Sequence, residues 1–201
     1  RYEYGSQAHI AHWNLTKLAE SLLPLLHENA DEAMKQAEVA ISEYANDFNS
    51  AWIFGMRSKL GLLNEEESDY ELAQSLLEWM ESSKTDYTET FRDLAYENLT
   101  EKEIYKSLAF KKWHSLWQAR LSRNSKPIKS ALSMMRKCNP VIIPYNYLVE
   151  EALVAAEEGN MNPFLKLLSA LEKPFEFSSS NEVFLNSPVN RNPHYQTFCG
   201  T

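Results

Sequence analysis

The side chain most open to chemistry in this 201-residue sequence is Cys199, one of two cysteines and the third residue from the C-terminus. A thiol this close to the end of a chain is expected to be exposed, and the exposed thiolate is the form that oxidants and partner thiols attack. The second cysteine, Cys138, is interpreted as a packing residue at a helix end. Cys199 is therefore the predicted redox site. A disulfide with Cys138 and a terminal cysteine without any role both remain open.

The histidines are interpreted as structural. His9 and His12 are three residues apart, so they would share a helical face that could bind a metal ion. No second pair and no nearby cysteine or aspartate completes such a site, which favours a surface or structural role. His114 lies between Trp113 and Trp117, and it is expected at the edge of a core to which both tryptophans belong.

The charged runs also have structural interpretations. Glu65-Glu66-Glu67 precedes Ser68-Asp69-Tyr70-Glu71, a capping-box pattern, and carboxylates are favoured at a helix N-terminus. Paired acid–base catalysis is the alternative for this run. The basic residues Lys111, Lys112, Arg120 and Arg123 follow a helical spacing and are interpreted as a solvated face. With no glycine-rich phosphate loop, nucleophile elbow or Cys-x-x-Cys motif, the sequence predicts no catalytic, cofactor-binding or metal-binding residue.

The composition excludes several classes of protein. The net charge of −8 argues against an extended nucleic-acid surface, which would need clustered Lys and Arg. The longest apolar runs are too short to span a membrane, and the N-terminus lacks the layout of a signal peptide. A hydrophobic content of 44% with five tryptophans indicates a packed globule. Two cysteines fit a reducing compartment, so we expect a soluble intracellular protein without a membrane partner.

The apolar spacing predicts an all-α fold with at least eight helices. One stripe comprises Leu15, Leu18, Leu22 and Leu25, and a longer one comprises Ala33, Ala37, Ile41, Tyr44, Phe48 and Trp52. Gly61 is expected to end the second helix. Four tryptophans are predicted to be mostly buried: Trp13, Trp52, Trp79 and Trp117.

Proline and capping patterns predict the later helices. Thr100-Glu101-Lys102-Glu103 repeats the capping-box pattern, and Pro127 is suited to the first turn of a helix. The last two helices are expected over 144–158 and 163–171. The pattern after Pro174 loses its period, so we predict a helical domain over 1–174 and an irregular C-terminal tail over 175–201.

Several segments resemble one family along nearly the whole chain. They are Arg1-Tyr2-Glu3-Tyr4-Gly5-Ser6-Gln7, Trp13-Asn14-Leu15-Thr16-Lys17-Leu18-Ala19, Lys59-Leu60-Gly61-Leu62, Asp86-Tyr87-Thr88-Glu89-Thr90-Phe91-Arg92, and Asn139-Pro140 followed by Asn146 and Glu150. In this order they resemble the selenoprotein O family, also known as the YdiU family, whose kinase-fold members transfer AMP to protein hydroxyls. Cys199-Gly200-Thr201 stands where some members carry selenocysteine. Ser6, Ala8 and Tyr145 depart from the family's usual Asn, Pro and Arg, and the last departure puts a charge-based role at that position in doubt.

The resemblance implies that the chain is the C-terminal lobe of a protein adenylyltransferase. In this family the nucleotide-binding, catalytic and Mg²⁺-holding residues precede the Arg-Tyr-x-Tyr segment, so ATP and Mg²⁺ would bind upstream of Arg1 and not to this chain. We accordingly expect a catalytically silent fragment of a longer, bacterial cytoplasmic protein. The implied partners are the upstream catalytic lobe and the protein substrates of the parent. The resemblance also implies that the partner of Cys199 is an upstream cysteine. The alternative function is a free-standing acidic helical module that binds other proteins.

Overall fold

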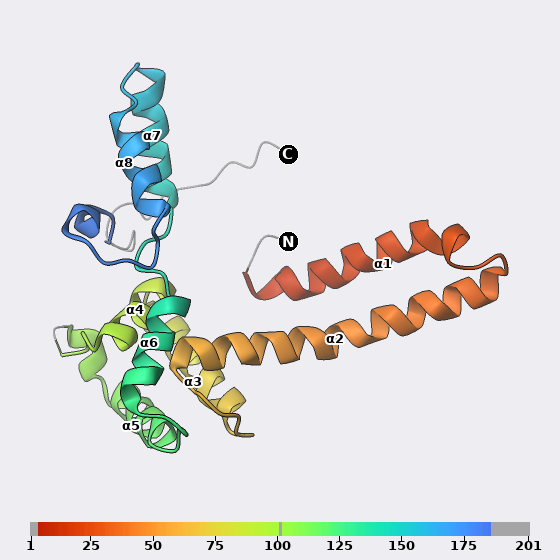
Figure 1. Ribbon diagram of the computed structural model, residues 1–201, viewed down its shortest axis with the longest axis horizontal. Helices are drawn as coiled ribbons and strands as arrows, with labels where there is room; N and C mark the ends of the chain where they lie inside the picture. The colour runs from red at the N-terminus through yellow and green to blue at the C-terminus, as the bar shows by residue number, and fades with distance from the viewer. Residues whose placement is uncertain (1–3, 101, 186–201) are drawn as a thin grey trace. The chain divides into compact units, whose positions relative to one another are not determined.

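A computed structural model describes residues 4–100 and 102–185 of the chain. These residues form eight α-helices and three short 3-10 helices, and no strand occurs among them, which confirms the all-α prediction. The chain divides into two compact units, unit 1 before Met56 and unit 2 from Met56 onward. Figure 1 draws the helices of both units.

Unit 1 is a hairpin of two long helices. The short helix η1 (Tyr4–Ser6) leads into α1 (Gln7–Leu26), and α2 (Ala30–Leu60) runs back beside α1 before its last turn enters unit 2 (Figure 1). Asn29 caps α2, because its Oδ1 accepts the backbone N–H groups of Asp31 and Glu32 at 2.9 and 3.1 Å. The Tyr44 hydroxyl donates to the Ala8 carbonyl at 3.2 Å and holds the two helices together near their open end.

Burial in unit 1 is sparse. Among residues 5–55 only Ala33 is buried. The predicted burial of Trp13 is wrong, since its side chain is 55% exposed, and Trp52 is half-buried. The α2 stripe faces α1 through Tyr44, whereas the α1 leucine stripe is largely exposed. A correct helical period therefore predicted the helices but not what covers them.

Unit 2 contains the remaining helices. They are α3 (Asp69–Ser83), α4 (Tyr87–Tyr96), η2 (Glu103–Lys106), α5 (Leu108–Leu121), α6 (Ile128–Cys138), α7 (Asn146–Glu157), α8 (Asn162–Leu171) and η3 (Ser179–Phe184). Helix α3 packs on α5 and α4 packs on α6, while α7 and α8 form a separate antiparallel pair (Figure 1). That pair has its own small core, which includes Leu148, Ala152 and Leu167.

The core of unit 2 is built around aromatic side chains. Trp79, Trp113 and Trp117 are all buried, which confirms the prediction for Trp79 and Trp117 and the core interpretation of the Trp113–Trp117 pair. The indole N–H of Trp113 donates to the Leu72 carbonyl, and that of Trp117 donates to the Leu60 carbonyl, both at 2.9 Å. Buried indoles need such partners, so these bonds fix α5 against the ends of α2 and α3.

Helix ends agree with the sequence except at the two predicted capping boxes. Gly61, at φ 74°, ends α2 as predicted. Ser68 precedes α3 but makes no side-chain capping bond, and the segment after Thr100 forms η2 before α5 begins. Besides Asn29 at the start of α2, two residues cap helices with side-chain bonds: Asp86, which accepts from the Glu89 N–H at 2.7 Å, and Ser107, which accepts from the Phe110 N–H. Helices α6, α7 and α8 begin within two residues of Pro127, Pro144 and Pro163.

The segment after α8 returns to the body of unit 2. The Pro174 carbonyl accepts the backbone N–H groups of Val141 and Ile142 at 2.7 and 3.2 Å. Val141 and Ile142 form a small core with Ala170, and Leu185 packs against it. The division at 174/175 into domain and tail stays a prediction, and most of that tail lies outside the described residues.

Candidate functional site

The side chains singled out in the sequence do not converge on one centre. Cys199 lies outside the described residues, and Cys138 is the half-buried last residue of α6. His9 is exposed, and the ring of His12 lies 5.5 Å from that of Tyr44. Residues 4–100 and 102–185 contain no group of three or more metal-ligating side chains.

His114 lies at the edge of the unit 2 core, as predicted. Its ring stacks on Phe110 at 5.7 Å and tilts against Trp117 at 5.4 Å. Burial lowers the pKa of this imidazole, so the ring is neutral near pH 7. Neutrality suits a ring held between two aromatic side chains, and it gives His114 a packing role.

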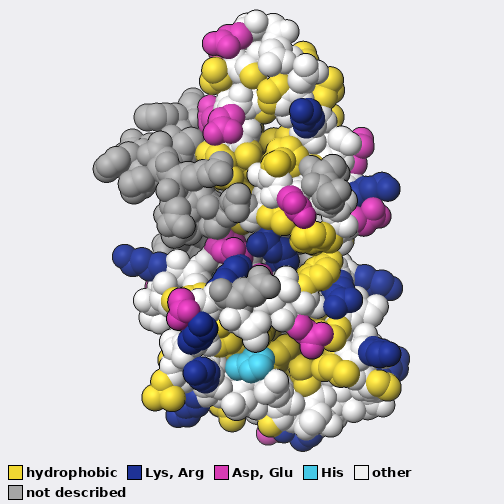
Figure 2. Space-filling view, turned by 90° about the vertical axis from the view of Figure 1, so that its left-hand side faces the viewer, with side chains coloured by type: hydrophobic (Ala, Val, Ile, Leu, Met, Phe, Trp, Pro, Cys, Tyr) yellow, Lys and Arg dark blue, Asp and Glu magenta, His cyan; other side chains and the backbone are white. Residues whose placement is uncertain are grey.

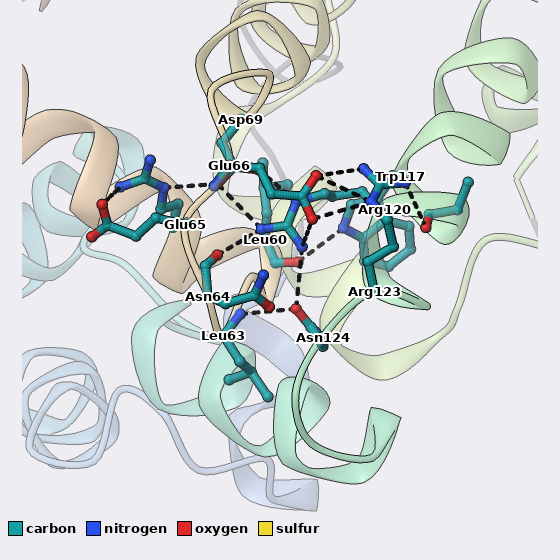
Figure 3. A network of polar contacts seen from close by, with 12 residues as sticks. Leu60, Leu63, Asn64, Glu65, Glu66, Asp69, Trp117, Arg120, Arg123 and Asn124 are labelled. Carbon is teal, nitrogen blue, oxygen red and sulfur yellow. Dashed lines mark hydrogen bonds and ion pairs between the residues drawn. The ribbon is translucent and has the colours of Figure 1, made fainter.

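The strongest polar arrangement surrounds Asp69, at the start of α3 (Figure 3). Its fully buried carboxylate accepts from the Arg120 Nε at 2.6 Å and from the Arg57 Nε at 2.8 Å. It also accepts the Glu66 backbone N–H at 2.9 Å. Three helices, α2, α3 and α5, thus each supply a charged group to one buried centre.

The donors determine the charge of Asp69. Burial by itself would raise the pKa of this carboxyl, but hydrogen bonds from Arg120, the Glu66 N–H and Arg57 outweigh it and hold the pKa below its ordinary value. Arg120 is 2% exposed, so its assignment to a solvated face is wrong. A buried guanidinium requires such a carboxylate partner, because an unpaired buried charge is strongly destabilising.

Glu66 and Asn124 extend this network over the loop between α2 and α3. Glu66 bridges Arg120 and Arg123 at 3.3 and 2.7 Å, and Arg123 lowers the pKa of its carboxyl. Asn124 accepts the Leu63 N–H at 3.0 Å and donates to the Gly61 carbonyl at 2.8 Å. Ion pairs with arginines therefore engage two residues of the acidic run before α3, Glu65 and Glu66.

A second junction brings together the motif segments that lie far apart in the sequence. The Lys59 ammonium lies over the rings of Tyr87 and Phe91, at 5.4 and 5.2 Å from their centres. It donates to Asn139 Oδ1 at 3.2 Å, and the Asn139 side chain returns a bond to the Lys59 carbonyl at 2.9 Å. Burial lowers the pKa of Lys59, an effect that Cys138 partly opposes. The motif residues thus fasten α2, α4 and the end of α6 to one another.

Helix α4 is anchored at this junction by its N-cap residue, Asp86, and by Arg92 in its middle. The Tyr145 hydroxyl donates to Asp86 Oδ1 at 3.1 Å, and burial raises the pKa of this phenol. Arg92 is buried and donates through one nitrogen to the Val141 and Leu185 carbonyls, both at 3.2 Å. Tyr145 therefore supports the cap of α4 through a neutral hydrogen bond.

A hollow of about 540 Å³ lies beside His114, between α4, α5 and α6. Its lining includes the apolar side chains of Leu94, Trp117, Leu121, Ile128 and Leu132, with Lys126 at its border. On the face drawn in Figure 2, dark-blue Lys and Arg side chains are dispersed among hydrophobic and acidic ones. A largely apolar lining suits an apolar group better than a nucleotide phosphate.

The charged groups of the Asp69 and Lys59 clusters are engaged in positioning helices. The Asp69 oxygens are occupied by Arg57, Arg120 and a backbone N–H, so this carboxylate is engaged where a general base would have to be free. Lys59 is likewise engaged with Asn139 and two aromatic rings. Within the described residues, no helix is both long and apolar enough to cross a membrane.

Asp69, Arg120 and Lys59 are the residues that sequence reasoning missed. The sequence patterns place Asp69 in a capping box and Arg120 on an exposed face. The two residues are 51 positions apart and pair only in the fold, so no local pattern shows that they meet. One signal was available for Arg120, since it follows Trp113 and Trp117 at steps of four and three and so lies on the buried side of α5.

Comparison with known proteins gives one consistent result. The family model of the protein adenylyltransferase SelO matches residues 1–172. The chain is 44% identical to the protein nucleotidyltransferase YdiU of Bacillus cereus strain ATCC 10987, and 45% identical to those of Clostridium botulinum strain Eklund 17B and Bacillus mycoides strain KBAB4. Each alignment covers all of this chain and 41% of the relative, so the chain spans less than half the length of these proteins.

Proposed function

Because the chain belongs to the protein adenylyltransferase SelO family, we propose that it is the C-terminal helical part of an enzyme that transfers AMP from ATP to Ser, Thr or Tyr hydroxyls of proteins. In that reaction the hydroxyl oxygen bonds to the α-phosphorus, pyrophosphate leaves and the hydroxyl proton is released. ATP and Mg²⁺ are the cofactors of the whole enzyme, which works in the bacterial cytoplasm. This chain alone is inactive and binds neither.

The observation that carries the proposal is the continuous similarity of the whole chain to a part, under half, of much longer nucleotidyltransferases. Nucleotidyl transfer depends on metal ions and on fixed cations around the triphosphate. The buried cations of unit 2, Arg92 and Arg120, donate to carbonyls and carboxylates of the fold itself. Such a region supports a nucleotide site elsewhere in the enzyme and does not form one.

Labelled ATP tests the assignment. The full-length protein encoded by the gene, incubated with Mg²⁺ and ATP labelled at the α-phosphate, should transfer label to protein. The 201-residue chain should transfer none, and titration with ATP and Mg²⁺ should give no saturable heat. Micromolar ATP binding by the chain alone would contradict its assigned inactivity, and an inactive full-length protein would contradict the enzyme assignment.

A second candidate is an acidic helical module that binds other proteins without catalysis. It is favoured by the leucines that α1 leaves exposed and by the net charge of −8. The gene decides between the two functions. An in-frame upstream region of family length supports the enzyme part, and a start codon close to Arg1 supports the module.

We also propose that the tail is redox-sensitive through Cys199, with an upstream cysteine as its partner in the whole enzyme. Maleimide labelling of the native chain should modify Cys199 faster than the half-buried Cys138. Equal rates would contradict an exposed, reactive tail.

A further inference from the structure

The leucine stripe of α1 is an apolar surface that unit 1 leaves uncovered. It consists of Leu15, Leu18, Leu22, Leu25 and Leu26. Their exposed fractions range from 37% for Leu22 to 82% for Leu25, and no residue of α1 is buried. At 100° per residue the five positions fall within an arc of about 100°, the width of a core-facing stripe.

The stripe is distinct from the face of α1 that contacts α2. That contact face carries His12, whose ring lies 5.5 Å from that of Tyr44, and Ala19 and Leu23, which line a groove with α2. It lies roughly a quarter of a turn around α1 from the stripe. Helix α1 therefore has two apolar faces and a partner for only one of them.

Unit 1 has too little core to hold this surface in water unaided. Ala33 is its one buried side chain within residues 5–55, whereas the stability of protein helices comes mainly from a packed apolar face. A contiguous exposed apolar patch on such a helix marks an interaction surface. The missing element is a protein surface that packs along α1.

We propose that the region of the full-length enzyme outside this chain covers the leucine stripe, so that α1 is the helix on which the catalytic lobe docks. This inference rests on the proposed function. The relatives carry more than half of their length outside the matched part, which is ample chain to bury one helix face. A second copy is disfavoured by charge. Residues 4–55 contain two lysines and seven Asp and Glu residues, so two copies of this acidic surface would repel each other.

Site-resolved thiol labelling tests the proposal. Leu18→Cys and Leu25→Cys are made separately in the 201-residue chain and in the full-length protein, with Glu43→Cys on the exposed side of α2 as the control. Maleimide modification is followed peptide by peptide, so that Cys138 and Cys199 are read separately. Both stripe positions should label rapidly in the chain and at least about tenfold more slowly in the full-length protein, while the control labels alike in both.

The other occupants give different results. Slow labelling in the 201-residue chain itself would overturn the proposal, because the chain would then cover its own stripe. Labelling that slows as the chain is concentrated, together with a dimer mass in light scattering, would also overturn it in favour of a second copy. Rapid labelling in both proteins would leave the stripe uncovered and the proposal wrong.

Two further measurements complete the test. Amide hydrogen exchange of residues 15–26 in the unmodified proteins needs no variant, and it should be slower in the full-length protein if α1 is packed there. AMP transfer by the full-length protein is assayed in parallel. An active protein with an accessible stripe refutes the docking surface alone, and an inactive protein with a protected stripe refutes the proposed function alone.

Discussion

In unit 1 two helices of 20 and 31 residues bury one side chain among residues 5–55, whereas in unit 2 helices of 10 to 15 residues bury most of the aromatic core. The difference lies in the partners of each helix. Helix α5 of unit 2 is contacted through Trp113, Trp117 and Arg120, each with a buried hydrogen bond to another segment. Within the described residues, helix α1 is held to α2 by contacts of Tyr44. Length and apolar period make a helix amphipathic, but only convergent neighbours make it part of a core.

The sharpest test of this comparison replaces one tryptophan in each unit. Trp117→Ala should destabilise unit 2 by about 3–5 kcal/mol, because it leaves a cavity and removes the donor to the Leu60 carbonyl. Trp13→Ala should change stability by less than about 0.5 kcal/mol, since that side chain is largely exposed. Urea unfolding followed by far-ultraviolet circular dichroism measures both. Similar losses for the two variants would break the comparison.

The buried charge of unit 2 gives the next largest effect. Asp69→Asn should cost about 3 kcal/mol, because the buried Arg120 guanidinium loses its charged partner. Glu65→Gln is the matched control in the same loop. Its carboxylate also pairs with an arginine, Arg57, but is largely exposed, so its loss should cost less than about 1 kcal/mol.

Acid titration provides a second measurement at Asp69. The pKa of this carboxyl is lower in the fold than its ordinary value of 3.8, so the stabilisation is present above that value and is lost as the pH falls through the folded pKa. The Asp69→Asn chain should therefore show a shallower loss of stability on acidification. An unchanged acid limb would contradict the ion pairs around Asp69.

Replacing a glycine by alanine in each unit should give a smaller difference in stability. The two positions are Gly55 in unit 1 and Gly61 in unit 2, both near the end of α2. Gly61→Ala should destabilise by about 2 kcal/mol, since φ is 74° there and a Cβ atom would lie 2.9 Å from the Met135 sulfur. Gly55→Ala has open space around it within a helix and should stabilise by about 0.5–1 kcal/mol. Thermal melts of the two variants should shift in opposite directions, and a shared direction would contradict the packing at Gly61.

Periodicity predicted the helices because it depends on residues three and four apart. The C-terminal stop at Gly61 and the starts near Pro127, Pro144 and Pro163 depend on local backbone preferences, which the sequence displays directly. Burial depends on residues distant in the sequence. Trp13 and Trp117 both lie in helical patterns. Trp117 is buried and donates to a carbonyl of another segment, whereas Trp13 is largely exposed.

The candidate sites were harder to predict for the same reason. Asp69 and Arg120 look like a capping residue and a surface cation until the fold brings them to 2.6 Å. Lys59, Phe91 and Asn139 lie in three motif segments, and the resemblance to a family named those segments without saying that they meet. Under the proposed function, the residues that carry nucleotide chemistry lie outside the chain, and no pattern within it could reveal them.

The smallest expected effect is the pH dependence contributed by His114. Burial between Phe110 and Trp117 lowers the pKa of this imidazole in the fold, whereas in the unfolded chain it returns toward its ordinary value of 6.5. The unfolded state therefore binds more protons as the pH falls below about 6.5, and the folded state loses stability over that interval until the folded pKa is passed. His114→Gln should flatten this part of the curve, measured as urea midpoints between about pH 7.5 and 5. Equal slopes in the His114 variant and the unmodified chain would show that the ring is solvated. The packing of α5 would then resemble that of the sparsely packed helices of unit 1.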